Sequence, residues 1–284
     1  MSRYHPFRLA TTALAVCMTS VLSIAHAASD PTGQVLILLP NSDESSMRVL
    51  WQTGDDFGPS LPCNQRSYSL DVRIDGTLVQ RFNSNSSPLS SYANGNCYLE
   101  RPIYTGEQKV PPGIWTATAR NPAGTALITE TKTINACTPK QGKQPMYWTI
   151  NSQYTDNFYT TSIGDRDVSL SIGYSNAGVP FAMPMPTRFG GVPFYRYFKD
   201  SPQLEHFYTH DYAEWQFVEQ NGYTYEGIEG YAFKNFKPGA VALWRYSLYD
   251  GYSGDLMHYY TINSNDPSAA GWSYDGLAGY VCAP

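Results

Sequence analysis

The stretch HFYTHD, residues 206–211, has two altered copies elsewhere in the chain, NFYTTS at 157–162 and HYYTIN at 258–263. An aromatic block precedes each copy, in the order MYWTI (146–150), FYRYF (194–198) and LWRYS (243–247). A block that begins and ends with glycine follows each copy, in the order GYSNAG (173–178), GYTYEG (222–227) and GWSYDG (271–276). Three blocks that recur in one order, at a spacing of about 49 residues, indicate three structural repeats.

Each repeat contains a start signal and a stop signal for a short helix. A polar residue followed three positions later by an acid forms a capping-box pattern, which marks a helix N-terminus. The three pairs are Ser162–Asp165, Asp211–Glu214 and Asn263–Asp266. A glycine suited to end the helix follows in each repeat, at Gly173, Gly222 and Gly271. Each repeat is therefore predicted to run strand, loop, strand, short helix, strand, with the shortest helix in the third repeat.

The strand and turn signals predict a mainly β protein with two domains. Residues 28–136 contain strand patterns, such as VLILLP and MRVLWQT, and two hairpin signals at 75–76 and 121–124. This pattern predicts an immunoglobulin-like β-sandwich. Residues 141–284 are predicted to form a pseudo-threefold repeat domain, β-trefoil-like or prism-like, with short capped helices. Its repeats span residues 146–182, 194–233 and 243–282.

The first 27 residues have the pattern of a secretory signal peptide. Arg3 and Arg8 precede an apolar stretch, and Ala25, His26 and Ala27 form a small-x-small cleavage site. No later stretch reaches the ~18 apolar residues that a membrane span needs. We therefore expect a secreted or periplasmic protein without membrane insertion. The formal net charge of −5 and the lack of a basic run disfavour nucleic acid as a partner.

Four cysteines follow the predicted cleavage site, and an even number in an exported chain indicates two disulfides. They are Cys63, Cys97, Cys137 and Cys282. The favoured pairing joins Cys63 to Cys97 within the sandwich and Cys137 to Cys282 across the two ends of the repeat region. The alternatives, 63–137 with 97–282 or 63–282 with 97–137, would tie the two domains together.

Three polar positions change together between the repeats. Where repeat 1 has Trp148, Asn157 and Ala177, repeats 2 and 3 both have an arginine, a histidine and an acid. The two sets are Arg196, His206 and Glu226, and Arg245, His258 and Asp275. Residues that vary as a set are expected to touch one another. One interpretation is a buried ion-pair cluster that fixes strand register, and the other is a pair of equivalent ligand sites beside aromatic faces.

Aromatic residues are concentrated in the repeat region, which holds most of the chain's 23 tyrosines. Those in strand blocks are expected to pack in the core or across strands. Others fall in loop-like segments, where exposed rings can stack on the apolar faces of sugars. These are Tyr154, Tyr212, Tyr249 and Tyr252.

The chain has no motif that indicates catalysis, a metal or a cofactor. His206 and His210 are four residues apart, as two zinc ligands can be, but His210 aligns with Thr161 and Ile262 in the other repeats. GYSG at 251–254 lacks the final glycine of a nucleophile elbow, and no H-E-x-x-H, P-loop or dinucleotide fingerprint occurs. We therefore predict no catalytic residue, metal or cofactor, although a carboxylate-pair glycosidase would leave no short motif.

The repeats resemble a family of secreted repeat domains of unknown function with a signature of the form HFYT…GYxxEG. The matching segments are FYRYF, HFYT, Glu214 and GYTYEGIEGY in repeat 2, and LWRYS, HYYT and GWSYDGLAGY in repeat 3. The resemblance covers the C-terminal half of the chain. It implies an appendage domain of exported proteins, often attached to hydrolases, with a surface-binding or glycan-binding role and no catalytic residues to carry over.

These observations favour an exported, non-catalytic binding protein that recognises glycan or cell-envelope polysaccharide through its C-terminal repeats. The six residues of the two Arg–His–acid sets are the candidate ligand-binding residues, and the sandwich is a spacer or interaction module. One alternative is a secreted hydrolase that acts on polysaccharide or peptide bonds. Another is a protein-binding adhesin or inhibitor that uses tyrosine-rich surfaces.

Overall fold

A computed structural model of the protein describes most of the chain after the predicted signal peptide. The described residues are 28–29, 34–42, 44–53, 61–91, 96–107, 109–152, 156–186, 190–200, 204–250 and 255–284. The predicted signal peptide, residues 1–27, lies outside them. The described residues are mainly β, as the sequence predicts, and include two short α-helices. Its strands form several antiparallel sheets, and no sheet closes on itself within the described residues.

Two antiparallel sheets make up the N-terminal part of the described chain. The first has the order β1-β2-β3-β7-β6 and the second the order β5-β4-β8-β9. Their strands are β1 (Ala28–Ser29), β2 (Val35–Pro40), β3 (Met47–Gln52), β4 (Ser69–Ile74), β5 (Thr77–Asn83), β6 (Ser90–Ser91), β7 (Cys97–Ile103), β8 (Gly113–Arg120) and β9 (Ala126–Ile134). Alternate residues of β3 and β8 are buried, so one face of each sheet supplies a shared core that includes Trp51 and Trp115.

Both predicted hairpins are present. Asp75 and Gly76 have φ angles of 48° and 82°, the left-handed values that a two-residue turn between β4 and β5 requires. The second hairpin joins β8 to β9, and the side chain of Asn121 closes its turn by accepting a hydrogen bond from the Thr125 N–H at 3.0 Å.

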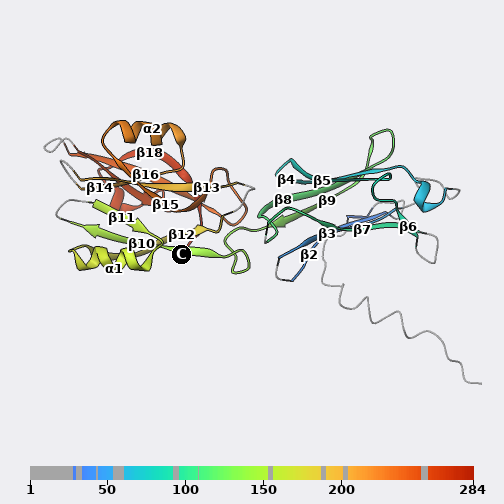
Figure 1. Ribbon diagram of the computed structural model, residues 1–284, viewed down its shortest axis with the longest axis horizontal. Helices are drawn as coiled ribbons and strands as arrows, with labels where there is room; N and C mark the ends of the chain where they lie inside the picture. The colour runs from blue at the N-terminus through green and yellow to red at the C-terminus, as the bar shows by residue number, and fades with distance from the viewer. Residues whose placement is uncertain are drawn as a thin grey trace, which may run out of the picture.

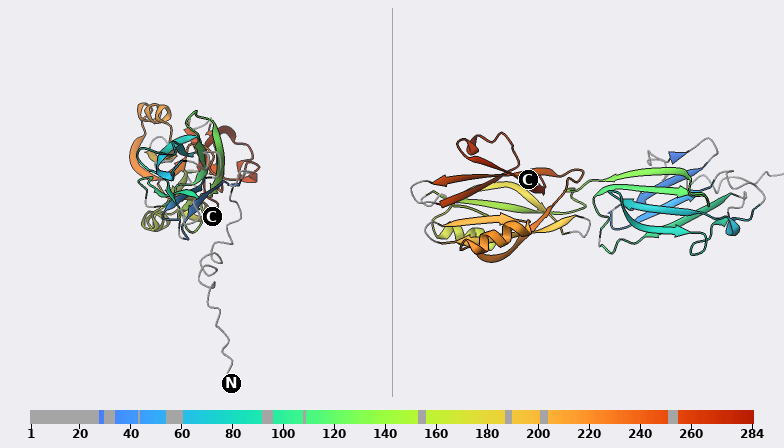
Figure 2. Two further views of the ribbon diagram at one scale, coloured as in Figure 1. Left: turned by 90° about the vertical axis from the view of Figure 1, so that its right-hand side faces the viewer. Right: turned by 90° about the horizontal axis from the view of Figure 1, so that it is seen from above.

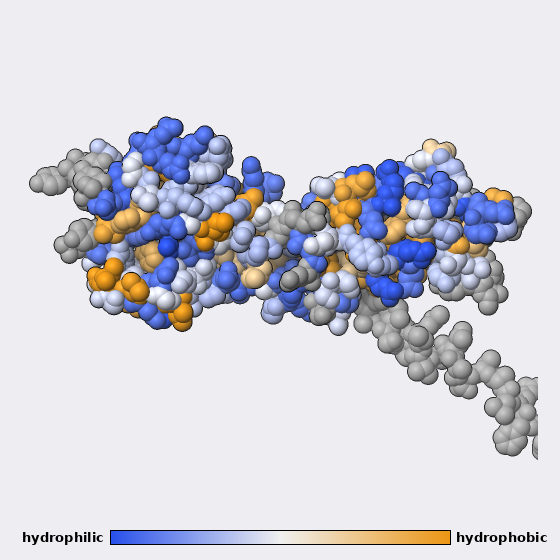
Figure 3. Space-filling model, viewed as in Figure 1, coloured by the Kyte–Doolittle hydropathy of each residue, from blue (hydrophilic) through white to orange (hydrophobic). Residues whose placement is uncertain are grey.

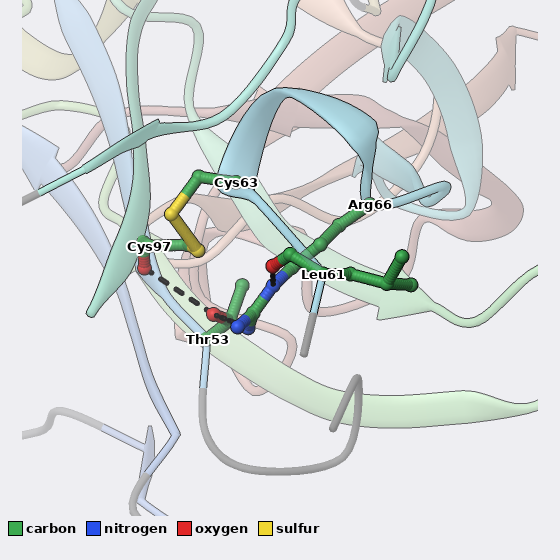
Figure 4. The surroundings of a disulfide bond; sticks show 5 residues. All are labelled: Thr53, Leu61, Cys63, Arg66 and Cys97. Atoms are coloured by element: carbon green, nitrogen blue, oxygen red, sulfur yellow. Dashed lines mark hydrogen bonds between the residues drawn. A yellow bond between two sulfur atoms is a disulfide. The ribbon is translucent and has the colours of Figure 1, made fainter. Parts of the chain in front are cut away.

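The disulfide between Cys63 and Cys97 confirms the favoured pairing in this part of the chain. Cys63 begins a short 3-10 helix (Cys63–Gln65), and Cys97 begins β7. Figure 4 shows how Arg66 supports the bond: its Nη1 donates to Thr53 Oγ1 at 3.2 Å, and Thr53 donates in turn to the carbonyl of Cys97. The bridge and these hydrogen bonds fasten the segment before β4 to the other sheet.

Each sequence repeat folds as one three-stranded unit whose first strand lies in the middle. The units have the orders β11-β10-β12, β14-β13-β15 and β17-β16-β18. Their strands are β10 (Lys143–Asn151), β11 (Asp156–Thr160), β12 (Ser175–Pro184), β13 (Gly191–Lys199), β14 (Glu205–Thr209), β15 (Thr224–Phe233), β16 (Val241–Asp250), β17 (Asp255–Thr261) and β18 (Ser273–Val281). A pairing between Phe233 and Tyr280 joins the second and third units, and a bridge between Ala182 and Cys282 ties the first to the third.

The predicted helix lies before the last strand of each repeat. Helices α1 (Ile163–Ser171) and α2 (Tyr212–Gln220) begin after the expected N-caps, Ser162 and Asp211, whose side chains accept backbone N–H groups of the first turn. They lie on opposite outer sides of the C-terminal sheets (Figures 1 and 2). In repeat 3 the helix is a single 3-10 turn (Pro267–Ala269), and its N-cap is Asp266 rather than Asn263. Pro267 explains this, because it has no N–H to donate and Asp266 caps Ser268 instead.

Three buried tyrosines, one from each repeat, are joined at the centre of the C-terminal part. The hydroxyl of Tyr208 donates to the Tyr159 carbonyl at 2.7 Å and accepts from the Tyr159 N–H at 2.8 Å. Tyr260 makes the same two contacts with Tyr208, at 2.7 and 2.9 Å, and Tyr159 makes them with Tyr260, at 3.2 and 3.1 Å. Because each hydroxyl bonds the backbone of a neighbouring repeat, these six hydrogen bonds hold the three units in a ring, which we call the tyrosine ring.

The two parts of the protein lie at opposite ends of its long axis (Figures 1 and 2). The second disulfide, between Cys137 and Cys282, confirms the favoured pairing and joins the start of the repeat region to its end. Polar contacts span the junction: Lys237 Nζ lies 2.5 Å from Asp75 Oδ2, and Gln141 Nε2 donates to Glu44 Oε2 at 2.8 Å. No helix within the described residues has the length and apolar content of a membrane span.

Candidate functional site

The arginine, histidine and acid of repeat 2 lie together at the interface with repeat 1. Arg196 projects from the central strand β13, and its Nε donates to Glu226 Oε2 of β15 at 2.8 Å. Its Nη1 donates to Glu229 Oε2 at 2.5 Å, and its guanidinium lies 3.5 Å from Asp165 Oδ2 of repeat 1. The side chain of Arg196 is only 14% exposed and lies over the ring of Phe158. Three carboxylates therefore surround one largely buried cation.

His206 of β14 lies beside this group and also reaches repeat 1. Its Nδ1 lies 2.8 Å from Asp156 Oδ2, and its backbone N–H donates to Asp156 Oδ1 at 2.9 Å. Its Nε2 lies 3.7 Å from Glu226 Oε2. The hydroxyl of Tyr174 also donates a hydrogen bond to Asp156 Oδ2, at 2.6 Å. The histidine thus connects a carboxylate of repeat 1 to the carboxylate that Arg196 binds.

The same arrangement recurs one repeat further on. Arg245 is held by both oxygens of Glu214 in repeat 2, at 2.5 and 3.0 Å, and its Nε lies 3.3 Å from Asp275 Oδ2. His258 Nδ1 lies 2.5 Å from Glu205 Oε1, and its Nε2 lies 3.7 Å from Asp275. The Arg245 guanidinium lies over the ring of Phe207, the counterpart of Phe158.

The contacts of Glu214 show that the predicted capping role of its carboxylate is wrong. The capping-box pattern assigns its carboxylate to the start of α2, but the carboxylate instead binds Arg245 and accepts from Thr209 Oγ1 at 2.5 Å. A charge-assisted bidentate pair is stronger than a bond to a backbone N–H, which explains the choice. Burial acts to raise the pKa of Glu214, but the hydrogen bonds and charge of Arg245 outweigh it and hold that pKa below its ordinary value.

Repeat 1 replaces the whole set with neutral partners at its interface with repeat 3. Trp148 takes the position of the arginines and lies over the ring of Tyr259. Its Nε1 donates to Asn157 Oδ1 at 3.0 Å, and Asn157 Nδ2 donates to the His258 carbonyl at 3.1 Å. Asp266, the counterpart of Asp165 and Glu214, accepts from the hydroxyl of Tyr259 instead of an arginine. The three positions therefore vary together because they belong to one contact between repeats.

The partners of the two histidines and of Arg196 outside their own Arg–His–acid sets were not identified from the sequence. Asp156 and Glu205 immediately precede the aligned residues Asn157 and His206. Each acid contacts the histidine of the following repeat: Asp156 contacts His206, and Glu205 contacts His258. In repeat 3 the aligned residue is Met257, which has no carboxylate. The repeat beside it, repeat 1, has Asn157 in place of a histidine. Glu229 has no counterpart; it also accepts from Thr160 Oγ1 at 3.0 Å. Burial raises its pKa, although Arg196 and the threonines act to lower it.

Exposed aromatic rings form a second group of candidate residues, on the outer face of repeat 2. Tyr212 contacts Trp215, Trp215 contacts Tyr195, and Tyr195 contacts Tyr225, with ring centroids 4.9, 5.7 and 6.0 Å apart. Tyr212 is 61% exposed and Tyr225 is 46% exposed, while the two rings between them are half-buried. We call these four residues the repeat-2 platform. Tyr197 lies beneath it, fully buried, with its ring 5.4 Å from Tyr225.

Repeat 3 carries a smaller version of this surface. Trp244 and Tyr274 occupy the positions of Tyr195 and Tyr225, with ring centroids 6.0 Å apart. Tyr274 is 58% exposed, and we call this pair the repeat-3 platform. Repeat 1 has Asn176 where the other repeats have Tyr225 and Tyr274. The exposed tyrosine is therefore present in the same two repeats as the Arg–His–acid sets.

Only part of the aromatic surface was identified from the sequence. Tyr212 and Tyr249 are exposed, at 61% and 65%, whereas Tyr154 and Tyr252 lie outside the described residues. Tyr225 and Tyr274 were assigned to strand packing. Tyr225 and Tyr274 could have been identified by their position next to Glu226 and Asp275, in a block whose sequence differs in repeat 1.

Other features of the described residues offer less chemistry. They contain no cluster of three or more metal-ligating side chains, and His210 is half-buried, which lowers its pKa. A cavity of about 640 Å³ lies at the junction of the two parts, between the loop at 106–112 and the start of β13. The described residues that line it include a single carboxylate, Glu107. On the face in Figure 3 the surface is mostly hydrophilic, and apolar side chains gather around α1.

Residues 145–282 match the family model of DUF5648, a domain of unknown function. The matched segment begins in β10 and ends at Cys282, so it spans the three repeats and includes one of the two cysteines of the second disulfide. This finding agrees with the expectation of an uncharacterised family in the C-terminal half. No curated protein matches the chain.

Proposed function

We propose that the protein is an exported, non-catalytic binding protein that recognises glycan through the aromatic platforms of repeats 2 and 3. The observation that carries the proposal is the exposed tyrosine that both repeats place at the same position, Tyr225 and Tyr274, beside a second aromatic ring. Exposed apolar surface of this kind marks binding sites more often than scattered single residues do. The ring faces are suited to the C–H faces of sugars, and neighbouring hydroxyls can bond sugar hydroxyls.

In this proposal the Arg–His–acid sets hold the repeats together and so position the platforms. The support is that each arginine and histidine contacts a carboxylate across a repeat interface, with side-chain exposures of 14% or less. Each acid of the sets contacts the arginine of its own repeat. In a second form of the proposal, the acids of these sets contact the ligand directly. Its support is that the carboxylates of Glu226 and Asp275 are 29% and 20% exposed.

A binding role is favoured over hydrolysis by the form of these surfaces. A glycosidase needs two carboxylates on either side of a bond within a cleft. The platforms are open faces, and the lining of the junction cavity in the described chain has one carboxylate. The two disulfides fit an oxidising compartment, which supports the proposed location outside the cytoplasm.

We also propose specific folds for the two parts. The strand orders β2-β3-β7-β6 and β5-β4-β8-β9 support an immunoglobulin-like sandwich, since they match the A-B-E-D sheet and an extended C-F-G sheet of that architecture. The tyrosine ring and the three-stranded unit formed by each repeat favour a prism-like over a trefoil-like repeat domain. The sandwich would then act as a spacer that presents the repeats.

A polysaccharide pull-down tests the functional proposal. The wild-type protein is mixed with insoluble peptidoglycan, chitin and cellulose, and the bound fraction and any soluble sugar products are measured. Retention on one of these without products supports the proposal. Release of products would replace it with a hydrolase, and no retention on any of them would favour the alternative of a protein partner.

A further inference from the structure

Repeat 2 has a carboxylate without a charged partner and a buried hydroxyl without a hydrogen-bond partner, and repeat 3 has neither at the aligned positions. Glu219, in the last turn of α2, accepts a hydrogen bond from Trp215 Nε1, and it belongs to no ion pair among the described residues. The buried hydroxyl of Tyr197, under the repeat-2 platform, has no hydrogen-bond partner within the described chain. A buried hydroxyl without a partner is costly, so its retention calls for an explanation.

Both groups lie beside Trp215 and α2: Tyr197 and Val218 form a buried cluster against which Trp215 packs, and Glu219 follows Val218 and accepts from Trp215 Nε1. Burial raises the pKa of the Tyr197 hydroxyl, and the charge of the Glu219 carboxylate adds to that shift. Lys199, two residues further along β13, lies over the ring of Tyr223 at 5.4 Å rather than beside Glu219. The Glu219 carboxylate, the Tyr197 hydroxyl and the rings of Trp215 and Tyr225 therefore belong to one connected group beside α2.

The other repeats offer matched comparisons. In repeat 3 the hydroxyl of Tyr246, the counterpart of Tyr197, donates to the Ser264 carbonyl at 2.9 Å. In repeat 1 the counterpart is Thr149, whose hydroxyl bonds Ser169 at 3.0 Å. Glu219 aligns with Leu170 of α1. The carboxylate and the unpartnered hydroxyl thus occur together, and only in repeat 2 among the described residues.

We propose that this position in repeat 2 recognises the free amino group of an amine-bearing glycan, with Glu219 as the counter-charge. The inference rests on the proposed glycan-binding function and narrows its ligand class. A protonated amine would bond the carboxylate and lie against the faces of Trp215 and Tyr225, which attract cations. Tyr225, which is 46% exposed and covers Tyr197, would turn aside to let the ligand reach the hydroxyl. Acidic glycans are disfavoured by the same carboxylate.

Matched oligosaccharides provide the test. Binding of a glucosamine hexamer and of an N-acetylglucosamine hexamer to the full chain is compared by titration calorimetry at mildly acidic pH and low salt. The wild type is expected to favour the amine form by about tenfold, as one charge-assisted hydrogen bond allows. The E219Q variant is expected to lose that preference. The control D167N removes an acid from α1 and is expected to keep it.

A second variant separates binding from stability. Y197F removes a hydroxyl that bonds nothing in the described chain, so it is expected to leave the melting temperature unchanged or raised and to weaken binding of the amine form severalfold. Its control, Y246F, is expected to lower the melting temperature and leave the preference intact. Equal affinity for the two hexamers in the wild type, an unchanged preference in E219Q, or unchanged binding in Y197F would overturn the inference while leaving glycan binding in place. Binding of neither hexamer, together with no retention on polysaccharide, would overturn both.

Discussion

The hydroxyl of Tyr260 bonds both backbone groups of Tyr208 in the preceding repeat, donating to its carbonyl at 2.7 Å and accepting from its N–H at 2.9 Å. Repeats 1 and 2 are linked in the same way by Tyr208 and Tyr159. Each tyrosine hydroxyl thus satisfies the buried backbone N–H and carbonyl of the tyrosine in a neighbouring repeat. The tyrosine ring explains why the FYT or YYT block recurs in all three repeats.

Removing one hydroxyl from this ring should destabilise the protein. Y260F leaves a buried N–H and a buried carbonyl of Tyr208 without their partner, and each such group costs about 1–3 kcal/mol. We expect the free energy of unfolding to fall by about 2–4 kcal/mol. Chemical denaturation of the purified variant measures it. Y249F, at a site that is 65% exposed, is the control, and a Y260F variant as stable as this control would contradict the account.

Arg196 should be a structural residue rather than a ligand contact. R196A leaves the buried carboxylate of Glu229 and the partly exposed carboxylates of Glu226 and Asp165 without their cation. Loss of one partner from a buried ion pair costs about 3–5 kcal/mol, so we expect a loss of about 3 kcal/mol in unfolding free energy. R48A, in an exposed pair, serves as the control. An R196A variant with unchanged stability and lost polysaccharide retention would support direct ligand contact instead.

Acid should weaken the interface between repeats 2 and 3. The folded-state pKa of Glu214 lies below its ordinary value of 4.5, because Arg245 outweighs the effect of burial. A group with a lowered folded pKa stabilises the protein above its unfolded pKa, and this stabilisation is lost as pH falls through the folded pKa. We expect the unfolding free energy to decline below pH 4.5, and E214Q to show a smaller decline. Equal pH dependence in the two proteins would count against this assignment.

The disulfide between Cys137 and Cys282 should stabilise more than the one between Cys63 and Cys97. The bridges span sequence separations of 145 and 34 residues. Loop-closure entropy assigns about 5 kcal/mol to the longer loop and about 4 kcal/mol to the shorter. Urea denaturation of C137S/C282S and C63S/C97S gives the two losses. A larger loss in C63S/C97S would show that factors other than loop entropy dominate.

The local structure of the repeats was largely predictable from the sequence. The block order gave strand, strand, helix, strand, and polar residues such as Ser162 and Asp211 marked the helix starts. These features depend on a few neighbouring residues, so a short pattern contains the information. The disulfide pairing also followed, because each favoured bridge lies within one part of the chain.

Contacts between repeats were not predictable in the same way. The joint variation of Arg196, His206 and Glu226 indicated that they touch, but not that Asp156 and Asp165 of repeat 1 complete the cluster. That depends on which repeat packs beside which. The exposed position of Tyr225 was missed because the β13–β15 pairing shifts register twice, so simple alternation does not assign its face.

The most direct test of the functional account is the affinity of a double variant that lacks both exposed tyrosines. Titration calorimetry with a soluble oligosaccharide of the retained polysaccharide compares wild type, Y225A/Y274A and Y104A, in which a 75% exposed tyrosine outside the repeats is removed. We predict that Y225A/Y274A folds normally and binds about 100-fold more weakly, roughly tenfold per platform, while Y104A binds like the wild type. Wild-type affinity in the folded double variant would contradict the proposal that the platforms bind glycan.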